Sequence, residues 1–230
     1  MGVRLPRRKP RNLLASLAYK LDRFLPLSRQ RKLDTLLDMA AVTNRLAMEH
    51  AAELGLNIWG ENAFIHSRIE PTDRALEIGC SSGRVLSTIE AKDRVGVDYD
   101  TAAIERGKRD HPDVTFIAGE ARDYLEKSDP FDVLILSHVL EHIDDPEQFL
   151  RTFAHRFNRI YVEVPDFEFT TNNAVRQERK RDLIYMDGDH VAEFDRDELE
   201  AIFKSVDLDV LDREFRWGFM RYWLTPHKGA

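Results

Sequence analysis

Residues 75–83 read Ala-Leu-Glu-Ile-Gly-Cys-Ser-Ser-Gly, and this stretch decides the fold. The mostly apolar residues 75–78, in which Glu77 is the one polar residue, predict a buried strand, which runs directly into a turn bounded by Gly79 and Gly83. Gly79 allows the chain to reverse tightly, and we expect Gly83 to let a ligand approach the backbone. The free N–H groups of the turn, with the dipole of a following helix, favour an anionic group such as a carboxylate. The stretch therefore predicts a ligand site at the end of a strand.

An acidic residue supplies the second part of this site. Asp98 lies nineteen residues after Gly79 and directly follows the apolar residues 95–97. A carboxylate at the tip of a second strand is the usual means of holding two ribose hydroxyls in such a sheet. The ligand is therefore expected to be a nucleoside. A nicotinamide cofactor is disfavoured, because its fingerprint needs glycine where Ser81 and Arg84 stand.

Outward from this stretch, short apolar strands alternate with helical segments, which predicts an α/β fold with a mostly parallel, doubly wound sheet. Residues 165–193 are polar and interrupt the alternation, so they predict an insertion that resembles a lid. Before the insertion, Asp145 is expected to cap the helix that begins at Pro146. After the insertion the alternation resumes where Asp195 and Glu198 form a capping box. The expected strands are 75–78, 94–97, 114–117, 133–136 and 160–164, then a hairpin of 208–215 and 217–224; the expected helices are 84–91, 101–109, 121–127 and 146–157.

The chain before this domain reads as a helical extension. An apolar stripe over residues 13–25 predicts one helix, and Ser28 is expected to cap a second helix that ends near Gly55. Residues 1–70 are therefore assigned to the extension and residues 71–230 to the α/β domain.

Composition limits the functions that the chain can have. The chain has 230 residues, 43% of them apolar, which suffices for one full core. Its single cysteine excludes a disulfide framework and a cysteine-rich zinc module, and a reducing cytoplasm is the expected location. Residues 1–32 carry ten Lys and Arg against one acid, whereas the other 198 residues carry 24 basic and 40 acidic side chains. The acidic body makes a nucleic-acid partner unlikely.

The motifs together resemble the class I S-adenosylmethionine-dependent methyltransferases, in the small-molecule group that includes types 11, 12 and 23. Besides residues 75–83, the resemblance is carried by 94–100 (Arg-Val-Gly-Val-Asp-Tyr-Asp) and 116–121 (Phe-Ile-Ala-Gly-Glu-Ala). The most specific match is 131–143, which ends in Ser-His-Val-Leu-Glu-His-Ile, and residues 190–194 (His-Val-Ala-Glu-Phe) are similar to the approach to the family's last helix. Ser81 replaces the family's middle glycine.

The resemblance implies a Rossmann-like seven-stranded sheet that binds S-adenosyl-L-methionine and releases S-adenosyl-L-homocysteine. It places Asp98 on the ribose, Glu120 and the N–H of Ala121 on the adenine, and the Ser81 hydroxyl near the methionine end. The full set of expected cofactor-binding residues is Glu77, Gly79, Cys80, Ser81, Gly83, Asp98, Tyr99, Glu120, Ala121 and Ser137. Apart from contact with the cofactor, Cys80 is expected to be a small buried residue, because no nearby group would make it a thiolate.

The acceptor of the methyl group needs a base when it is an oxygen or nitrogen, and histidine titrates in the right range. The candidates are His138 and His142 after the fourth strand and His190 in the insertion. No metal site is expected, because the acidic residues and histidine of the insertion fit no cation-loop pattern; they are Asp166, Glu168, Asp187, Asp189 and His190.

The expected acceptor is a small molecule or a lipid-linked group, for which a saccharide of a surface glycan is the hypothesis. The basic, amphipathic residues 1–27 suit an anionic membrane surface. The alternative is a helix that caps the active site or that binds a partner protein, such as a second copy of the chain. A mitochondrial presequence is a third interpretation of this segment. Two alternatives for the whole chain remain: a non-catalytic module that binds S-adenosylmethionine, and a nucleotide-sugar or NAD-dependent enzyme on the same fold.

Overall fold

The computed structural model describes residues 23, 26–54, 63–167, 173–180, 183, 189–216 and 218–227. The chain forms two compact units, residues 1–54 and 55–230, which are described separately. The predicted division at residue 70 stays a prediction.

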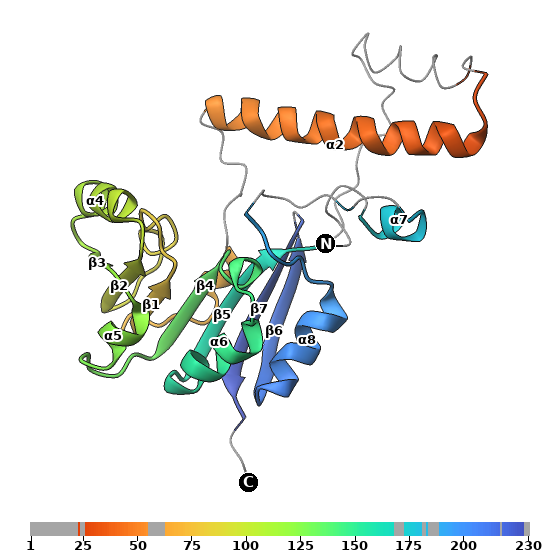
Figure 1. Cartoon of the computed structure of the whole chain (residues 1–230). Helices are drawn as coiled ribbons and strands as arrows, with labels where there is room; N and C mark the ends of the chain where they lie inside the picture. Colours follow the sequence, from red (N-terminus) through yellow and green to blue (C-terminus); the bar gives the residue numbers. More distant parts are fainter. Residues whose placement is uncertain are drawn as a thin grey trace. The chain divides into compact units, whose positions relative to one another are not determined.

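The first unit contains the long helix α2 (Arg29–Glu53), drawn in orange in Figure 1. The N–H of Arg31 donates to Oγ of Ser28 over 3.3 Å, which confirms the predicted cap. Apart from Arg23, the helix expected over 13–25 lies outside the described residues, as does Gly55. Within the described residues, no helix combines the length and the apolar character that a membrane span requires.

The second unit is built on a seven-stranded sheet, which confirms the predicted fold class. The strand order is β3-β2-β1-β4-β5-β7-β6, and the first five strands are parallel. β7 runs antiparallel to β5 and forms the predicted hairpin with β6. The strands are β1 (Arg74–Ile78), β2 (Asp93–Asp98), β3 (Thr115–Ala118), β4 (Val133–Ser137), β5 (Arg159–Pro165), β6 (Leu208–Arg216) and β7 (Phe219–Pro226).

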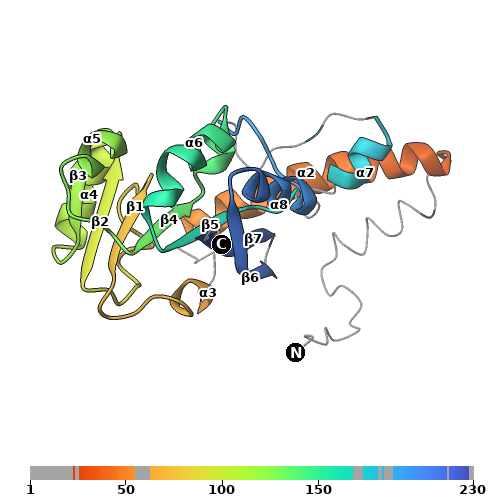
Figure 2. The ribbon, with the colours of Figure 1, turned by 90° about the horizontal axis from the view of Figure 1, so that it is seen from below.

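The alternation of side chains along each strand divides the core into two layers. In β4, Leu134 and Leu136 pack into one apolar cluster, whereas Val133 and Ile135 pack into the other. The first cluster is covered by α5 (Ala121–Leu125), α6 (Pro146–Phe153) and α8 (Arg196–Ser205), and the second by α3 (Ala63–His66) and α4 (Thr101–Asp110). Figure 2 shows α6 and α8 on one side of the sheet and α3 on the other.

Carboxylate caps fix where the helices of this unit begin. Asp145 accepts a hydrogen bond from the N–H of Gln148 at the start of α6, and Asp195 accepts one from Glu198 at the start of α8. Both caps confirm predictions. Asp100 caps α4 in the same way, because its carboxylate accepts hydrogen bonds from the N–H groups of Ala102 and Ala103.

The predicted helix over residues 84–91 is wrong, because residues 81–88 form a series of turns. Gly83 has a φ of 82° and Ser81 one of 48°, both outside the helical region. The N–H of Thr88 bonds to the carbonyl of Val85, three residues back, whereas Ser87 bonds to Gly83, four back. Burial of the side chains of Val85, Leu86 and Ile89 holds this segment in place. The expected contribution of a helix dipole is therefore wrong at this turn, and the N–H groups of Gly79, Ser81 and Gly83 are bonded within the protein instead of being free for an anionic ligand.

The predicted insertion is described in part. It contains the short helix α7 (Asn173–Glu178), while residues 168–172, 181–182 and 184–188 lie outside the described residues. Its role as a lid stays a prediction. Two 3-10 turns complete the unit, η1 (Leu140–His142) after β4 and η2 (Ala154–Arg156) after α6.

Candidate active site

A cavity of about 1050 Å³ lies at the carboxyl ends of the parallel strands, where open α/β sheets bind ligands. Its volume suits a nucleoside-sized ligand with room for a second molecule. Most of the lining comes from the ends of β1, β2, β3 and β4 and the segments directly after them, whereas Phe149 and Phe153 belong to α6 and Asp189 to the insertion. The lining residues are Ile78, Gly79, Ser81, Val97, Asp98, Tyr99, Asp100, Gly119, Glu120, Ala121, Arg122, Asp123, His138, Val139, His142, Ile143, Phe149, Phe153 and Asp189.

Asp98 is held rigidly at the tip of β2. Its Oδ2 accepts from the N–H of Ser81 over 2.7 Å, and its Oδ1 accepts from the N–H of Asp100 over 2.8 Å. Each carboxylate oxygen has two lone pairs, so both keep one for a further donor. Gly79 has a φ of 72°, and its N–H bonds to the carbonyl of Val97 over 2.9 Å. The first two strands thus present a fixed carboxylate that can accept hydrogen bonds from a diol.

Glycine is needed at position 83 for a different reason from the one that we predicted. A Cβ on Gly83 would lie 2.4 Å from Cζ of Phe116, and the residue does not line the cavity. The space in front of Gly83 is therefore filled by an aromatic ring of β3, not left open for a ligand. The prediction that a ligand approaches the backbone at Gly83 is therefore wrong, because the ring of Phe116 occupies this place.

Cys80 and Glu77 also lie behind the cavity wall. Cys80 is buried, with its Sγ packed against Gly96 of β2, and burial raises the pKa of its thiol. This agrees with the expectation of a small buried residue. Glu77 is 2% exposed, and burial raises the pKa of its carboxyl well above the ordinary value against the opposing effect of Arg84. Neither side chain lines the cavity.

Tyr99 and Glu120 form one wall of the cavity. The Tyr99 hydroxyl donates to Oε2 of Glu120 over 2.6 Å, and this hydrogen bond raises the pKa of Tyr99 to about 12. Next to them, Ala121 begins α5, and a Cβ built on Gly119 would meet nothing within 4 Å. This end of the cavity is therefore open and polar, and it offers the backbone N–H of Ala121 and the carboxylate of Glu120 to a ligand.

His138 is held between two buried carboxylates. Its Nδ1 lies 3.0 Å from Oε1 of Glu141, and its Nε2 lies 3.3 Å from Oε1 of Glu163. Burial opposes its charged form, but the two carboxylates raise the pKa of His138 to about 9. The neighbouring Ser137 ends β4, is buried and does not line the cavity, whereas His138 does.

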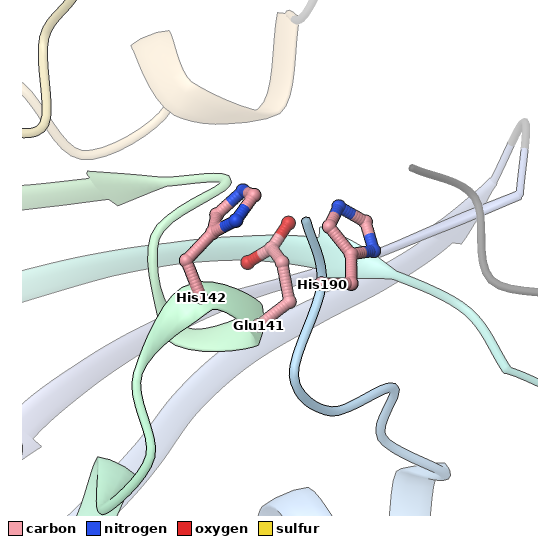
Figure 3. A group of neighbouring side chains, drawn as sticks. All are labelled: Glu141, His142 and His190. Carbon is pink, nitrogen blue, oxygen red and sulfur yellow. The ribbon is translucent and has the colours of Figure 1, made fainter. Parts of the chain in front are cut away.

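The structure brings His142 and His190 together from distant parts of the chain. Their ring centroids lie 4.8 Å apart, nearly perpendicular, and Glu141 stands beside them, as Figure 3 shows. His142 is exposed and lines the cavity, whereas the side chain of His190 is 4% exposed and does not. Nδ1 of His142 lies 3.3 Å from the carbonyl oxygen of Asp189.

Sequence reasoning did not select Glu141 as a site residue. The signal was present, because the spacing His-x-x-Glu-His places a carboxylate between two histidines on a single turn. Sequence reasoning also missed the apolar wall of the cavity. Ile143, Phe149 and Phe153 line it, and none of the three was among the predicted site residues.

Comparisons with known proteins agree with this geometry. A family model described as a methyltransferase domain matches residues 13–213, which is most of the chain. No curated protein matches. Among solved structures, the chain is similar to a TehB-like SAM-dependent methyltransferase from Corynebacterium glutamicum, with a TM-score of 0.53 and 18% identity over 81% of this chain and 97% of that one.

Two further structures share the fold. A S-adenosylmethionine-dependent methyltransferase from Clostridium acetobutylicum has a TM-score of 0.51 and 10% identity, and the match covers 94% of this chain and 100% of that one. The YcgJ protein from Bacillus subtilis has a TM-score of 0.54 and 14% identity over 73% and 97%. These likenesses establish the fold, and the family model establishes the family and favours it over an NAD-dependent enzyme or a non-catalytic module. The chain therefore belongs to the class I S-adenosylmethionine-dependent methyltransferases.

Proposed function

We propose that this enzyme methylates an oxygen or nitrogen of a small-molecule or lipid-linked acceptor, with a saccharide of a surface glycan as the favoured substrate. The observation that carries the proposal is the continuity of one cavity, which runs from Asp98 and Glu120 to His142 and Asp189. S-adenosylmethionine supplies an already activated methyl group on its sulfonium. The task left to the protein is to hold the cofactor and an acceptor in line.

The residues of the first half of the cavity fit the cofactor. Asp98 has lone pairs left for the two ribose hydroxyls, and its carboxylate is fixed before a ligand arrives. Glu120 and the N–H of Ala121 are suited to the adenine, beside the open space at Gly119. The loop at Gly79 and Ser81 is left for the methionine end. Glu77, Cys80, Gly83 and Ser137, which lie behind this wall, support the loop instead of touching the ligand.

The second half of the cavity is assigned to the acceptor. Of the three predicted bases, His138 has both ring nitrogens on carboxylates, so we assign it to positioning Glu141. His142 lines the cavity and has His190 and Glu141 as neighbours, which makes this corner the place where the acceptor loses its proton.

The character of the cavity wall supports an uncharged, hydroxyl-rich acceptor. Acidic side chains line much of the cavity, and Asp189 is the one beside His142, at the acceptor corner. Their negative charge repels phosphate groups, which disfavours nucleic acids and nucleotides as acceptors. Phe149, Phe153 and Ile143 add an apolar surface against which the face of a sugar ring can pack. The acidic lining residues are Asp98, Asp100, Glu120, Asp123 and Asp189.

The basic N-terminal segment, residues 1–27, is proposed to direct the enzyme to its acceptor. Its positive charge suits the anionic surface of a membrane, where lipid-linked acceptors reside. A partner protein with an acidic surface is the alternative occupant of this segment.

Transfer of labelled methyl groups tests the proposed function. The full chain is incubated with methyl-labelled S-adenosylmethionine and, in separate reactions, with free saccharides, lipid-linked saccharides, amines and nucleic acid. We expect label in a saccharide fraction, and much less of it at a low cofactor concentration when Asp98→Ala replaces the natural chain. Label that appears only in nucleic acid or protein would overturn the assignment of the acceptor.

A further inference from the structure

Glu141, His142 and His190 present one ligand atom each within 4.8 Å of one another (Figure 3). Two segments that are far apart in the sequence are tied together here, since the N–H groups of Val191 and Ala192 both donate to the carbonyl oxygen of Glu141. These backbone bonds, of 2.9 and 3.2 Å, fix residue 190 against η1. The fold therefore fixes the backbone of the cluster, and the exposed ring of His142 is the part that can adjust.

Each histidine of the cluster has a partner that orients its ring. The carbonyl of Asp189 can only accept, so its contact with Nδ1 of His142 places the proton on Nδ1 and leaves the lone pair on Nε2. Nδ1 of His190 lies 3.5 Å from Oε1 of Glu193, a carboxylate that is 1% exposed. Histidines that bind metals characteristically have a carbonyl or carboxylate on the other ring nitrogen.

Glu141 supplies the second, independent observation. The side chain is fully buried, and its Oε1 is hydrogen bonded to His138. Its Oε2 is buried and has no hydrogen-bond partner in the described part of the chain. A buried carboxylate oxygen without a partner costs free energy unless a cation or donor satisfies it. Oε2 of Glu141 can therefore serve as the negatively charged ligand of a cation, because the other two residues of the cluster are histidines.

We propose that Glu141, His142 and His190 bind a divalent cation of the Zn²⁺ or Mn²⁺ class, which leaves coordination positions open for an acceptor hydroxyl. Two imidazoles and a carboxylate form a set that suits such metals better than Mg²⁺ or Ca²⁺, which prefer all-oxygen sites. Tetrahedral zinc ligands lie about 3.4 Å apart, so the donor atoms need to close by about 1–1.5 Å at most. His142 is exposed and can make this adjustment by rotation.

The inference rests on the proposed function and explains how the acceptor loses its proton beside His142. A cation at the cavity edge lowers the pKa of a coordinated hydroxyl, so that its proton leaves to solvent. The acceptor oxygen then forms a bond to the methyl carbon as the carbon–sulfur bond breaks, and S-adenosylhomocysteine is released. The expectation of no metal came from the residues of the insertion, of which His190 alone belongs to this cluster. Of the others, Glu168 and Asp187 lie outside the described residues.

Metal binding to the full-length chain tests the inference without any acceptor. Chelator-treated protein is titrated with Zn²⁺, Mn²⁺ and Mg²⁺ by calorimetry, and Co²⁺ is used for its visible absorption. We expect one Zn²⁺ or Mn²⁺ per chain and much weaker binding of Mg²⁺. Glu141→Gln and His190→Ala should each weaken binding about 100-fold or more, because loss of an outer partner alone costs about 10–100-fold. Glu193→Gln should cost about 10-fold.

The exposed His66 provides the matched control, since it lies in α3 and does not line the cavity. His66→Ala should bind the metal like the natural chain, and S-adenosylhomocysteine affinity reports that each variant is folded. Absence of Zn²⁺, Mn²⁺ and Co²⁺ binding by the natural chain, or equal binding by Glu141→Gln, would overturn the inference. Failure of methyl transfer to every acceptor, with metal binding intact, would instead count against the proposed function alone.

Discussion

The N–H of Ser81 donates to Oδ2 of Asp98 over 2.7 Å, which joins the loop after β1 to the tip of β2. The bond is made within the protein itself, so the two halves of the cofactor site are pre-aligned. Ser81 adopts a φ of 48°, a conformation that a non-glycine residue holds only when its surroundings favour it. The Asp98 carboxylate thus holds the loop, and in the proposed function it also receives the ribose.

Replacement of Asp98 by alanine should weaken S-adenosylhomocysteine binding by about 1–3 kcal/mol, because charge-assisted hydrogen bonds to the ribose are lost. Isothermal titration calorimetry on the full chain measures this difference. Asp110→Ala, an exposed change at the end of α4, is the control and should bind normally. Unchanged affinity of Asp98→Ala would exclude this residue from the cofactor site.

Gly83→Ala should destabilise the fold by about 2–4 kcal/mol, because the added Cβ meets the Phe116 ring and the φ of 82° is unfavourable for alanine. Urea unfolding measures the loss. Gly119→Ala, where the Cβ meets nothing within 4 Å, should lose only the backbone part. Adding Phe116→Leu to Gly83→Ala should recover some stability. Equal losses for Gly83→Ala and Gly119→Ala would show that the packing against Phe116 is not the cause.

Glu77→Gln should raise stability at neutral pH. Burial raises the pKa of Glu77 in the folded chain, with Arg84 opposing and Glu163 and Asp98 adding to the rise. The folded state therefore keeps a proton that the unfolded state releases above about pH 4.5, so the natural chain loses stability as pH rises, by about 1.4 kcal/mol per unit at most.

Unfolding experiments at pH 5 and pH 8 reveal this difference. The advantage of Glu77→Gln over the natural chain should grow between the two by about 1 kcal/mol or more. Glu126→Gln, an exposed change, should show no such growth. An advantage that shrinks as pH rises would contradict the raised pKa.

Glu163→Gln should have the opposite pH profile. Burial opposes the ionisation of Glu163, but His138 and Arg221 lower its pKa to about 2, while Tyr161 donates to the same carboxylate and Glu77 lies near. Ionised Glu163 therefore stabilises the fold above pH 4.5, and this contribution disappears as the pH falls toward 2.

At pH 7 the substitution should cost about 3–5 kcal/mol, because the buried Arg221 loses the buried one of its two carboxylate partners. The cost should shrink below pH 4.5, as followed by urea unfolding at several pH values. Glu214 pairs with the same Arg221, but its side chain is 31% exposed. Glu214→Gln should therefore lower the free energy of unfolding by less than about 1 kcal/mol. A cost for Glu163→Gln that is constant from pH 7 to pH 3 would rule out the lowered pKa.

The parts of the fold that follow from local pattern were predictable. Alternating apolar strands and the caps at Asp145 and Asp195 were read from neighbouring residues, and both were confirmed. The helix predicted after Gly83 was wrong, because the packing of Phe116, which comes from another strand, acts on this turn. The Glu141–His190 contact depends on backbone bonds to residues 191 and 192, which no spacing in the sequence reveals.

Removal of the positive charge at positions 7, 8, 9 and 11 should weaken binding to anionic vesicles. These residues are Arg7, Arg8, Lys9 and Arg11, and all four are changed to Gln in the full chain. Each basic residue near an anionic surface contributes about 1 kcal/mol, so the loss should reach up to about 1000-fold at low salt. Co-sedimentation with vesicles that contain anionic lipid measures it.

Two further measurements, in which the salt concentration and the position of the removed charges are varied, distinguish binding through the basic segment from a general effect of net charge. Added salt should weaken vesicle binding of the natural chain far more than that of the variant, since screening acts on the same contacts. The control carries the same loss of four charges on the α/β domain, through Gln at the exposed Lys92, Arg106, Arg109 and Lys127. It should bind vesicles almost as the natural chain does, because its charges lie outside the basic segment. If the control loses as much binding as the N-terminal variant, net charge alone attracts the protein and the segment has no special role. If neither loses binding and a protein is instead retained by the segment, the occupant of residues 1–27 is a partner protein.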